Sequence, residues 1–288
     1  MIERGRPRPG RREPNPLKLS RRRRTNLSVG LALATLVVAL AVIGAVWTPV
    51  DPARMDMTHR AAPPTAAHLF GTDEFGRDTF SRALKGAGSA VEVGLGVAVI
   101  AGTLGLALGA LAGYRGGLVD EVLMRLIDGL YAFPPLIMAL ALVAVLGPGL
   151  RQVTVAIGLA EVPAFARLTR SLIIGLRQQL FVEAARAAGA TDWQIARRHL
   201  LPNAAPALIV QASIAFSTAV LAEAALSFLG LGVQPPSASW GLMLQEAQSF
   251  LTLAPWMAIF PGALIAATIL GFNLVADGLA ERSDPRLR

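Results

Sequence analysis

The sequence predicts an all-α membrane protein with six transmembrane helices and both termini in the cytoplasm. Hydrophobic residues make up 53% of the 288 residues and charged residues only 16%, with a mean hydropathy of +0.52. This is more apolar than a soluble domain. Two runs, 27–48 and 129–150, carry no charge over 22 residues each, which is enough to cross a hydrocarbon layer of about 30 Å.

Composition also limits the partners. The chain has no cysteine, which excludes disulfides and cysteine-ligated metals, and its three histidines are too scattered for a metal site. A net charge of +8 alone would suggest nucleic acid, but ten of the 27 Lys and Arg residues lie in residues 1–24. Such a cluster before an apolar run is typical of cytoplasmic anchoring beside anionic lipid. We therefore expect a basic cytoplasmic tail at 1–24, a transmembrane domain at 25–288, and lipid rather than nucleic acid or metal as a partner.

The first two spans follow from the apolar runs. Residues 27–48 form the first, and the alternative of a signal peptide is weakened because no convincing small-residue cleavage site follows. The polar stretch 49–85 predicts an external loop, and the second span runs from about 89 to 114. Its glycines recur every four residues and predict a face that another helix approaches closely: Gly105, Gly109 and Gly113.

The remaining spans depend partly on topology. Residues 129–150 form the third span, where the Pro134–Pro135 pair predicts a kink or a late helix start. Residues 152–174 are the weakest candidate, but a fourth span is needed to return the Arg-rich loop at 175–204 to the cytoplasm. The fifth and sixth spans are expected at 205–230 and 250–276, separated by an outer loop at 231–249 that holds one acidic residue and no Lys or Arg.

The most informative segment is the polar stretch 181–203, which we call the elbow. Its first part, 181–188, is Ala-rich and favours a helix. Gly189 is expected to break that helix because a positive φ costs glycine little. Thr191 and Gln194 have capping-box spacing for a second helix, and Pro202 is expected to end it. Two short helices joined by a glycine turn also fit a DNA-binding helix-turn-helix, but a position between membrane spans favours an elbow that contacts a soluble partner.

Six residues of the elbow form a spaced pattern: Glu183, Ala184, Ala185, Gly189, Leu201 and Pro202. This pattern resembles the EAA loop of bacterial ABC-importer permeases. His199 stands where the family has an apolar residue. The resemblance implies that this segment is the coupling helix that docks in a cleft of the ATPase subunit.

A second motif lies in the predicted external loop. Its residues are Gly71, Thr72, Asp73, Gly76, Arg77, Asp78, Ser81 and Arg82. The residue types predict a structured loop in which the two arginines pair with the two aspartates and the glycines allow tight bends. The segment also resembles a hallmark of the C-type subunit of dipeptide and oligopeptide importers, as do residues 226–236 with Trp240–Gly241, and the ending 273–286. The EAA loop and these three segments make four motifs, and the resemblance extends from about residue 25 to the C-terminus.

The resemblance implies a permease-like bundle in a bacterial inner membrane. It implies four kinds of subunit in one importer: this permease, a second homologous permease, two ATPase subunits and an external substrate-binding protein. The chain has no phosphate-binding loop, so we expect no cofactor here, with ATP and Mg²⁺ on the ATPase subunits, and no enzymatic activity. Nickel, glutathione or another small solute is an alternative cargo, and an ATP-independent channel or secondary transporter is the alternative class.

Acidic residues in apolar runs are costly in lipid and usually face a bundle interior or a cavity. Glu161 and Glu223 are the candidates for a translocation path. The alternative for each is a position near an interface or a hydrogen bond to a neighbouring helix.

Overall fold

The computed structural model describes residues 16–283, with side chains for 26–282. This part of the chain is helical throughout apart from its connecting loops. The main helices are α1 (Pro16–Val46), α2 (Thr79–Arg115), α3 (Gly117–Tyr131), α4 (Pro135–Leu146), α5 (Leu150–Arg177), α6 (Leu180–Ala187), α7 (Asp192–Ile195), α8 (Leu201–Phe228), α9 (Trp240–Ala247) and α10 (Trp256–Ser283). Short helical turns lie at Met57–His59, Ala196–Leu200 and Gln248–Phe250.

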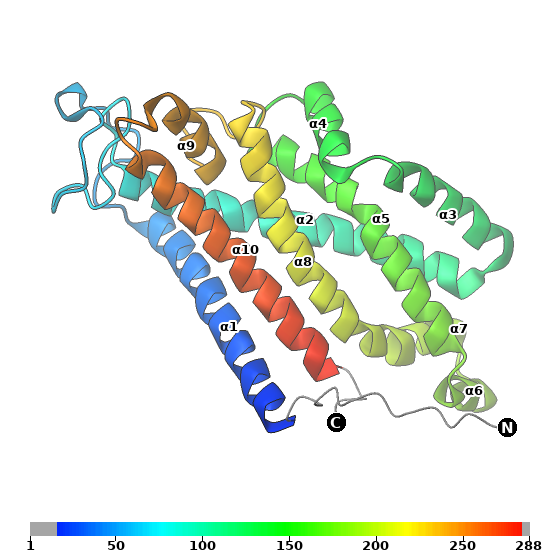
Figure 1. Cartoon of the computed structure of the whole chain (residues 1–288). Helices are drawn as coiled ribbons and strands as arrows, with labels where there is room; N and C mark the ends of the chain where they lie inside the picture. The colour runs from blue at the N-terminus through cyan, green and yellow to red at the C-terminus, as the bar shows by residue number, and fades with distance from the viewer. Residues whose placement is uncertain (1–15, 284–288) are drawn as a thin grey trace, which may run out of the picture.

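The long helices form one bundle (Figure 1). Helices α1, α10, α8 and α5 run in similar directions, and α2 crosses behind them. The start of α1, the end of α10 and the short helices α6 and α7 lie at one end, whereas α9 and the loop before α2 lie at the other. This arrangement agrees with the expectation that the elbow and the two ends of the chain share one side, although residues 1–15 and 284–288 lie outside the described part.

The number of spans is confirmed only in part. Within the described residues, four helical stretches are long and apolar enough to cross a membrane: 26–46, 79–115, 192–228 and 256–282. A fifth span arises only if α3 and α4, which meet at a bend of 86°, are counted as one. Residues 129–150 therefore do not form one spanning helix, and the kink or late helix start expected at the Pro134–Pro135 pair is confirmed. Helix α4 has 12 residues, about 18 Å, because Pro134 and Pro135 interrupt the helix.

Helix α5 is the predicted fourth span with a different start and end. It has 28 residues and is long enough to cross a membrane. It is not among the four apolar stretches because it carries several charged residues: Arg151, Glu161, Arg167 and Arg170. Helix α2 also departs from expectation, since it begins at Thr79 rather than near residue 89. The Asp78 side chain accepts a hydrogen bond from the Ser81 backbone N–H (2.8 Å), and this cap starts the helix among polar residues.

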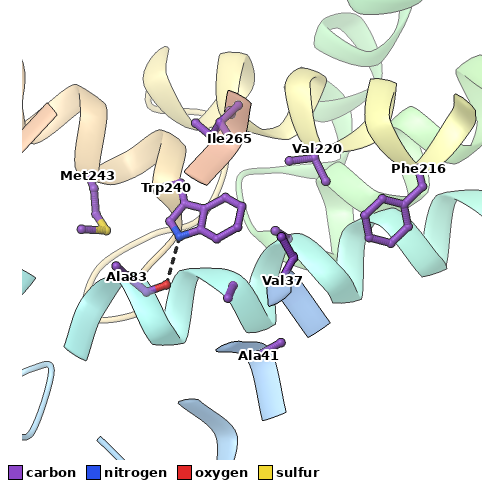
Figure 2. Packing of buried hydrophobic residues seen from close by; sticks show 11 residues of the cluster. Val37, Ala41, Ala83, Phe216, Val220, Trp240, Met243 and Ile265 are labelled. Carbon is purple, nitrogen blue, oxygen red and sulfur yellow. Dashed lines mark hydrogen bonds between the residues drawn. The ribbon is translucent and has the colours of Figure 1, made fainter. Parts of the chain in front are cut away.

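The core at the loop end of the bundle is built around Trp240 of α9 (Figure 2). Its ring is 2% exposed and its Nε1–H donates to the carbonyl oxygen of Ala83 in α2 (3.0 Å). The cluster includes apolar side chains from α1, α8 and α10, among them Val37, Phe216, Val220 and Ile265. A buried indole with a satisfied N–H fixes α9 firmly on α2.

The predicted glycine face is confirmed. Helix α2 packs along α5, and a Cβ at Gly105 would lie 2.3 Å from the Phe165 Cβ, while one at Gly109 would lie 2.3 Å from the Ala166 carbonyl oxygen. Such distances leave no room for a side chain. The two backbones approach closely because glycine is present at these positions.

Candidate functional site

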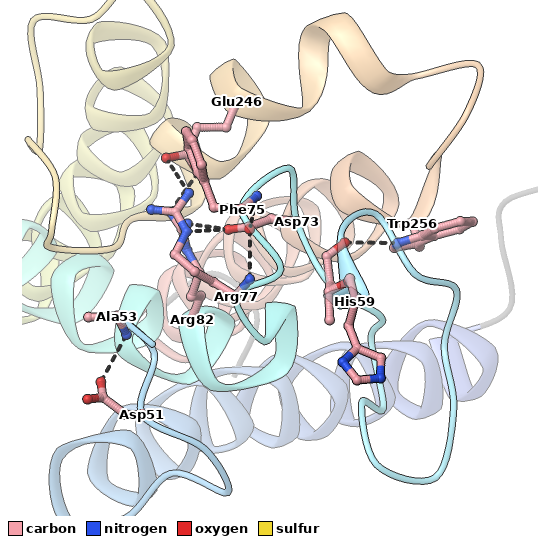
Figure 3. A network of polar contacts seen from close by, with 10 residues as sticks. Asp51, Ala53, His59, Asp73, Phe75, Arg77, Arg82, Glu246 and Trp256 are labelled. Atoms are coloured by element: carbon pink, nitrogen blue, oxygen red, sulfur yellow. Dashed lines mark hydrogen bonds and ion pairs between the residues drawn. The ribbon is translucent and has the colours of Figure 1, made fainter. Parts of the chain in front are cut away.

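The external motif folds into a buried ion-pair network (Figure 3). We call its four members, Asp73, Arg77, Arg82 and Glu246, the external cluster. The Asp73 carboxylate accepts from Arg77 Nε (2.6 Å) and Arg82 Nη1 (2.5 Å). The Glu246 carboxylate accepts from Arg77 Nη2 (2.9 Å) and Arg82 Nη2 (2.6 Å). Each guanidinium therefore bridges both carboxylates, and the four charges balance in a site where charge-assisted bonds are strong.

The remaining motif residues shape the loop. Asp78 caps α2 through Ser81, and its other carboxylate oxygen contacts Nδ1 of His68 (2.9 Å). The Thr72 hydroxyl accepts from the Ala62 N–H (2.8 Å). Gly71 and Gly76 have φ of +70° and +72°, a region that glycine occupies without strain. The motif residues thus form a structured loop held by their own hydrogen bonds, as their residue types predict.

The predicted pairing is partly wrong. Asp73 pairs with both arginines, whereas Asp78 pairs with neither, because its carboxylate is used at the start of α2. Sequence reasoning missed Glu246, which lies 164 residues beyond Arg82. The sequence signal was weak: Glu246 is the one acidic residue of the 231–249 loop, but the external motif already holds two aspartates for its two arginines.

A further carboxyl group, that of Glu74, lies next to the external cluster without belonging to it. Its Oε2 atom is buried and has no hydrogen-bond partner among the residues that the structure describes. Burial, together with the nearby negative charges of Glu246 and Asp73, raises the pKa of Glu74 to about 7. Burial disfavours the charged form, and like charges disfavour it further.

The elbow matches much of its predicted local structure. Helix α6 ends at Ala187, and Gly189 follows with φ +82°. The Ala190 N–H donates to the Ala185 carbonyl oxygen (3.0 Å), a bond typical of a glycine-terminated helix. Thr191 and Gln194 form the expected capping box, with each side chain accepting from the other's backbone N–H (3.3 and 2.8 Å).

Pro202 does not end the second helix, contrary to expectation. Helix α7 continues through a π-helical turn at Ala196–Leu200 into α8, giving one helical stretch from 192 to 228. Proline normally breaks a helix because it lacks an N–H and its ring clashes with the carbonyl four residues back. Here Pro202 lies in the first turn of α8, directly after the wider π turn. The π turn has already shifted the backbone hydrogen-bond pattern, so the helix continues past the proline.

The elbow has a buried side and an exposed side. Val182, Ile195 and Leu200 are at most 1% exposed and pack with Ile173 of α5. On the outer side, Leu180 and Trp193 are 80% and 69% exposed. The motif residues Glu183, Ala184, Gly189 and Pro202 are exposed, while Ala185 and Leu201 are half-buried. The elbow is therefore fixed to the bundle by one face and offers the other, which carries apolar anchors and Glu183.

Comparison with known proteins identifies the chain. The sequence profile of a family described as "Binding-protein-dependent transport system inner membrane component" matches residues 105–288. This chain belongs to that family. It is a non-catalytic, multi-pass permease subunit of the inner membrane that works with an ATPase and a binding protein.

Several curated relatives resemble the permease over most of its length. The dipeptide transport system permease protein DppC of Alkalihalophilus pseudofirmus is 42% identical over 260 residues, covering 90% of this chain and 86% of the relative. The probable D,D-dipeptide transport system permease DdpC of Escherichia coli is 42% identical, with coverages of 90% and 88%. The glutathione transport system permease GsiD of Pectobacterium atrosepticum is 41% identical, with coverages of 88% and 84%.

The fold also has a solved counterpart. A chain of the MetNI methionine ABC transporter in an inward-facing conformation superposes with a TM-score of 0.58 at 18% identity, covering 70% of this chain and 96% of that chain. At that identity the likeness establishes the fold alone. The permease therefore shares the bundle of this transporter.

The two acidic residues predicted to line a path occupy different surroundings in the permease. Glu161 of α5 is half-buried and accepts a long bond from the Thr218 hydroxyl of α8 (3.5 Å). Glu223 of α8 is 2% exposed and accepts from the Ser227 hydroxyl (2.6 Å). Ser227 in turn accepts from the Val233 N–H (3.1 Å), so Glu223 supports the loop that leads from α8 to α9.

Proposed function

We propose that the permease forms the membrane path for dipeptides or oligopeptides delivered by the external binding protein. The support is the combination of the external motif, the exposed elbow and relatives at 42% identity that are named as dipeptide permeases. Glutathione permeases at 41% identity make glutathione, itself a small peptide, the second candidate. Binding assays with the external binding protein from the same transporter test the choice: tight binding of nickel and no binding of peptides would refute it.

The proposed assembly contains this permease, a second homologous permease and two ATPase subunits. ATP and Mg²⁺ are expected on the ATPase subunits, and the permease is expected to bind neither. We further propose six membrane crossings with both termini cytoplasmic, in which the bent pair α3–α4 and the charged helix α5 each count as one crossing. Polar residues on α5 would then face protein or a path, since lipid disfavours them.

The elbow is the proposed lever. ATP binding closes the ATPase dimer, the elbow passes this movement to the bundle, and the path switches from inward-facing to outward-facing. The observation that carries this proposal is the two-sided elbow: one face is buried against α5, while the other exposes Leu180, Trp193 and Glu183. No hydrogen bond or ion pair to Glu183 is found among the described residues, which leaves its carboxylate free for a donor on the ATPase.

Two substitutions test the lever. Gly189→Val forces a β-branched residue to φ +82°, which costs roughly 1–2 kcal/mol or more in backbone strain. No neighbour lies within 4 Å of the added Cβ, so the defect arises from the backbone and from bulk on the docking face. Glu183→Lys reverses the exposed charge. We expect both variants to insert normally but to lose uptake and ATP hydrolysis stimulated by the loaded binding protein.

A matched control is Gly175→Val on α5. Gly175 is exposed, has no positive φ and also has no neighbour within 4 Å of an added Cβ. Uptake should persist in this variant. All variants are compared in reconstituted vesicles after the subunit stoichiometry has been checked, and normal uptake with normal stimulation in both elbow variants would disprove the lever.

Glu161 is the proposed path residue, and Glu223 has a positioning role in the described conformation. Glu161 is half-buried with one weak bond, whereas Glu223 is enclosed beneath the α8–α9 loop. Glu161→Gln should change the relative uptake rates of peptides with different net charge while leaving the amount of assembled transporter unchanged. Equal effects on all peptides would argue against contact with the cargo.

A further inference from the structure

The external cluster is complete without Glu74. Two guanidinium groups face two carboxylates, and four hydrogen bonds of 2.5–2.9 Å join them. A third carboxyl group beside this balanced set has no further guanidinium group to pair with, since Arg77 and Arg82 are both paired with Asp73 and Glu246. The Oε2 atom of Glu74 is nevertheless buried and receives no hydrogen bond from any described residue. A carboxylate in such a position is costly, because attraction by Arg77 and a hydrogen bond from the Glu74 backbone only partly offset the loss of water.

The charged groups around Glu74 come from three elements. Its own loop contributes Asp73 and Arg77, helix α9 contributes Glu246, and helix α2 contributes Arg82, which is bound to both acids. Asp73 and Glu246 repel a negative charge on Glu74, and Arg77 attracts it. The attraction is weakened because the Nε and Nη2 donors of Arg77 already point to Asp73 and Glu246. The surroundings therefore favour an uncharged Glu74.

We propose that Glu74 is a proton-binding site on the external side of the permease, and that its proton controls how firmly the external loop is tied to α9. With the proton bound, the cluster holds two positive and two negative charges. After the proton leaves, three carboxylates share two guanidinium groups, and the added charge repels Glu246 on the neighbouring helix. The tie between the loop and α9 is then weaker. This site does not depend on which cargo the permease carries.

The direction of the pH effect follows from linkage. Glu74 is protonated up to about pH 7 in the folded state, against 4.5 for an ordinary glutamate. Between these values the folded protein holds a proton that the unfolded chain has released, so stability falls as pH rises through this window. The contribution is fully present below the lower value and is lost above the upper one. Because Glu74 is only half-buried, solvent screening reduces its size.

Two measurements on the assembled transporter test the proposal. The first compares infrared spectra of the wild type and Glu74→Gln near pH 6; the wild type should show a protonated carboxyl band that the variant lacks. The second follows the thermal unfolding midpoint between about pH 5 and pH 8. The wild type should lose stability across this range more steeply than Glu74→Gln, which keeps the shape of the side chain and cannot titrate.

Asp51→Asn is the matched control. Asp51 lies on the same external loop and is exposed, and among the described residues its side chain accepts a hydrogen bond only from the Ala53 N–H (2.9 Å; Figure 3). This variant should keep both the infrared band and the slope of the wild type. The proposal is overturned if the band survives in Glu74→Gln, if it is absent from the wild type near pH 6, or if the two midpoint curves run parallel.

Discussion

Close packing between α2 and α5 gives the sharpest test of the fold. Gly109 and Gly102 both lie in α2, two turns apart, but their surroundings differ. A Cβ at Gly109 would lie 2.3 Å from the Ala166 carbonyl oxygen and 2.7 Å from the Thr169 Cβ, whereas one at Gly102 would meet only Phe165 Cε1 at 3.8 Å. The same substitution, glycine to alanine, should therefore destabilise at one position and not at the other.

The size of the effect can be worked out from the distances. Ordinary van der Waals contact begins at 3.4 Å, so the Ala166 oxygen would have to withdraw by about 1 Å (3.4 less 2.3). Backbone atoms on a packed helix cannot do this alone, and overpacking of this kind costs roughly 1–3 kcal/mol. Both variants also gain up to about 1 kcal/mol of intrinsic helix propensity. That gain cancels in the comparison, and Gly109→Ala should be less stable than Gly102→Ala by roughly 1–3 kcal/mol.

The assay is the thermal unfolding midpoint of the purified transporter, measured for both variants in the same detergent. Gly102→Ala should match or exceed the wild type, and Gly109→Ala should unfold several degrees lower. Gly109→Leu should assemble poorly. Equal midpoints for the two alanine variants would show that α2 and α5 are not in backbone contact, and the reasoning would fail.

Three further outcomes are expected. A reporter fused after Arg288 should be cytoplasmic and one inserted near Pro64 external, and a cytoplasmic signal at Pro64 would contradict the six-span topology. Asp78→Ala removes the cap of α2 and the contact with His68, so the unfolding midpoint should fall by the equivalent of about 0.5–2 kcal/mol; an unchanged midpoint would count against the cap. Trp240→Phe removes the indole N–H that donates to the Ala83 carbonyl oxygen, which keeps its helical donor, and should cost about 0.5–1.5 kcal/mol, measured in the same way.

Local signals were read correctly from the sequence because their physics is local. The turn at Gly189, the capping box at Thr191 and the glycine face of α2 each depend on residues within a few positions of one another. The pairing of Glu246 could not be found in this way, since its partners lie more than 160 residues away. The external motif holds two aspartates for its two arginines, and only the fold shows that Glu246 takes the place expected for Asp78.

The effect of Pro202 was misread for a different reason, whereas the break at the Pro134–Pro135 pair was predicted correctly. Pro202 and the Pro134–Pro135 pair give the same signal in the sequence, yet the first lies within one continuous helical stretch and the second separates two helices at 86°. The outcome depends on what precedes each proline. A π turn at Ala196–Leu200 accommodates Pro202, whereas Ala132 and Phe133 leave the helix before Pro134. Propensity alone does not distinguish these cases, because the surrounding packing decides.

The elbow and the external cluster are joined by an unbroken series of contacts. The stretch 192–228 carries the second elbow helix at one end and Glu223 at the other, where Ser227 holds the loop before α9. Helix α9 is fixed to α2 by Trp240 and to the external loop by Glu246.

We propose from this connection that movement of the elbow changes the mobility of the external cluster. Hydrogen exchange of the amides of Asp73 and Arg77 should then differ between the nucleotide-free and ATP-bound transporter, and Gly189→Val should abolish the difference. Physical contact alone does not establish coupling. If the exchange rates are the same with and without ATP, the external loop and α9 move as one rigid unit, and switching is confined to the other helices.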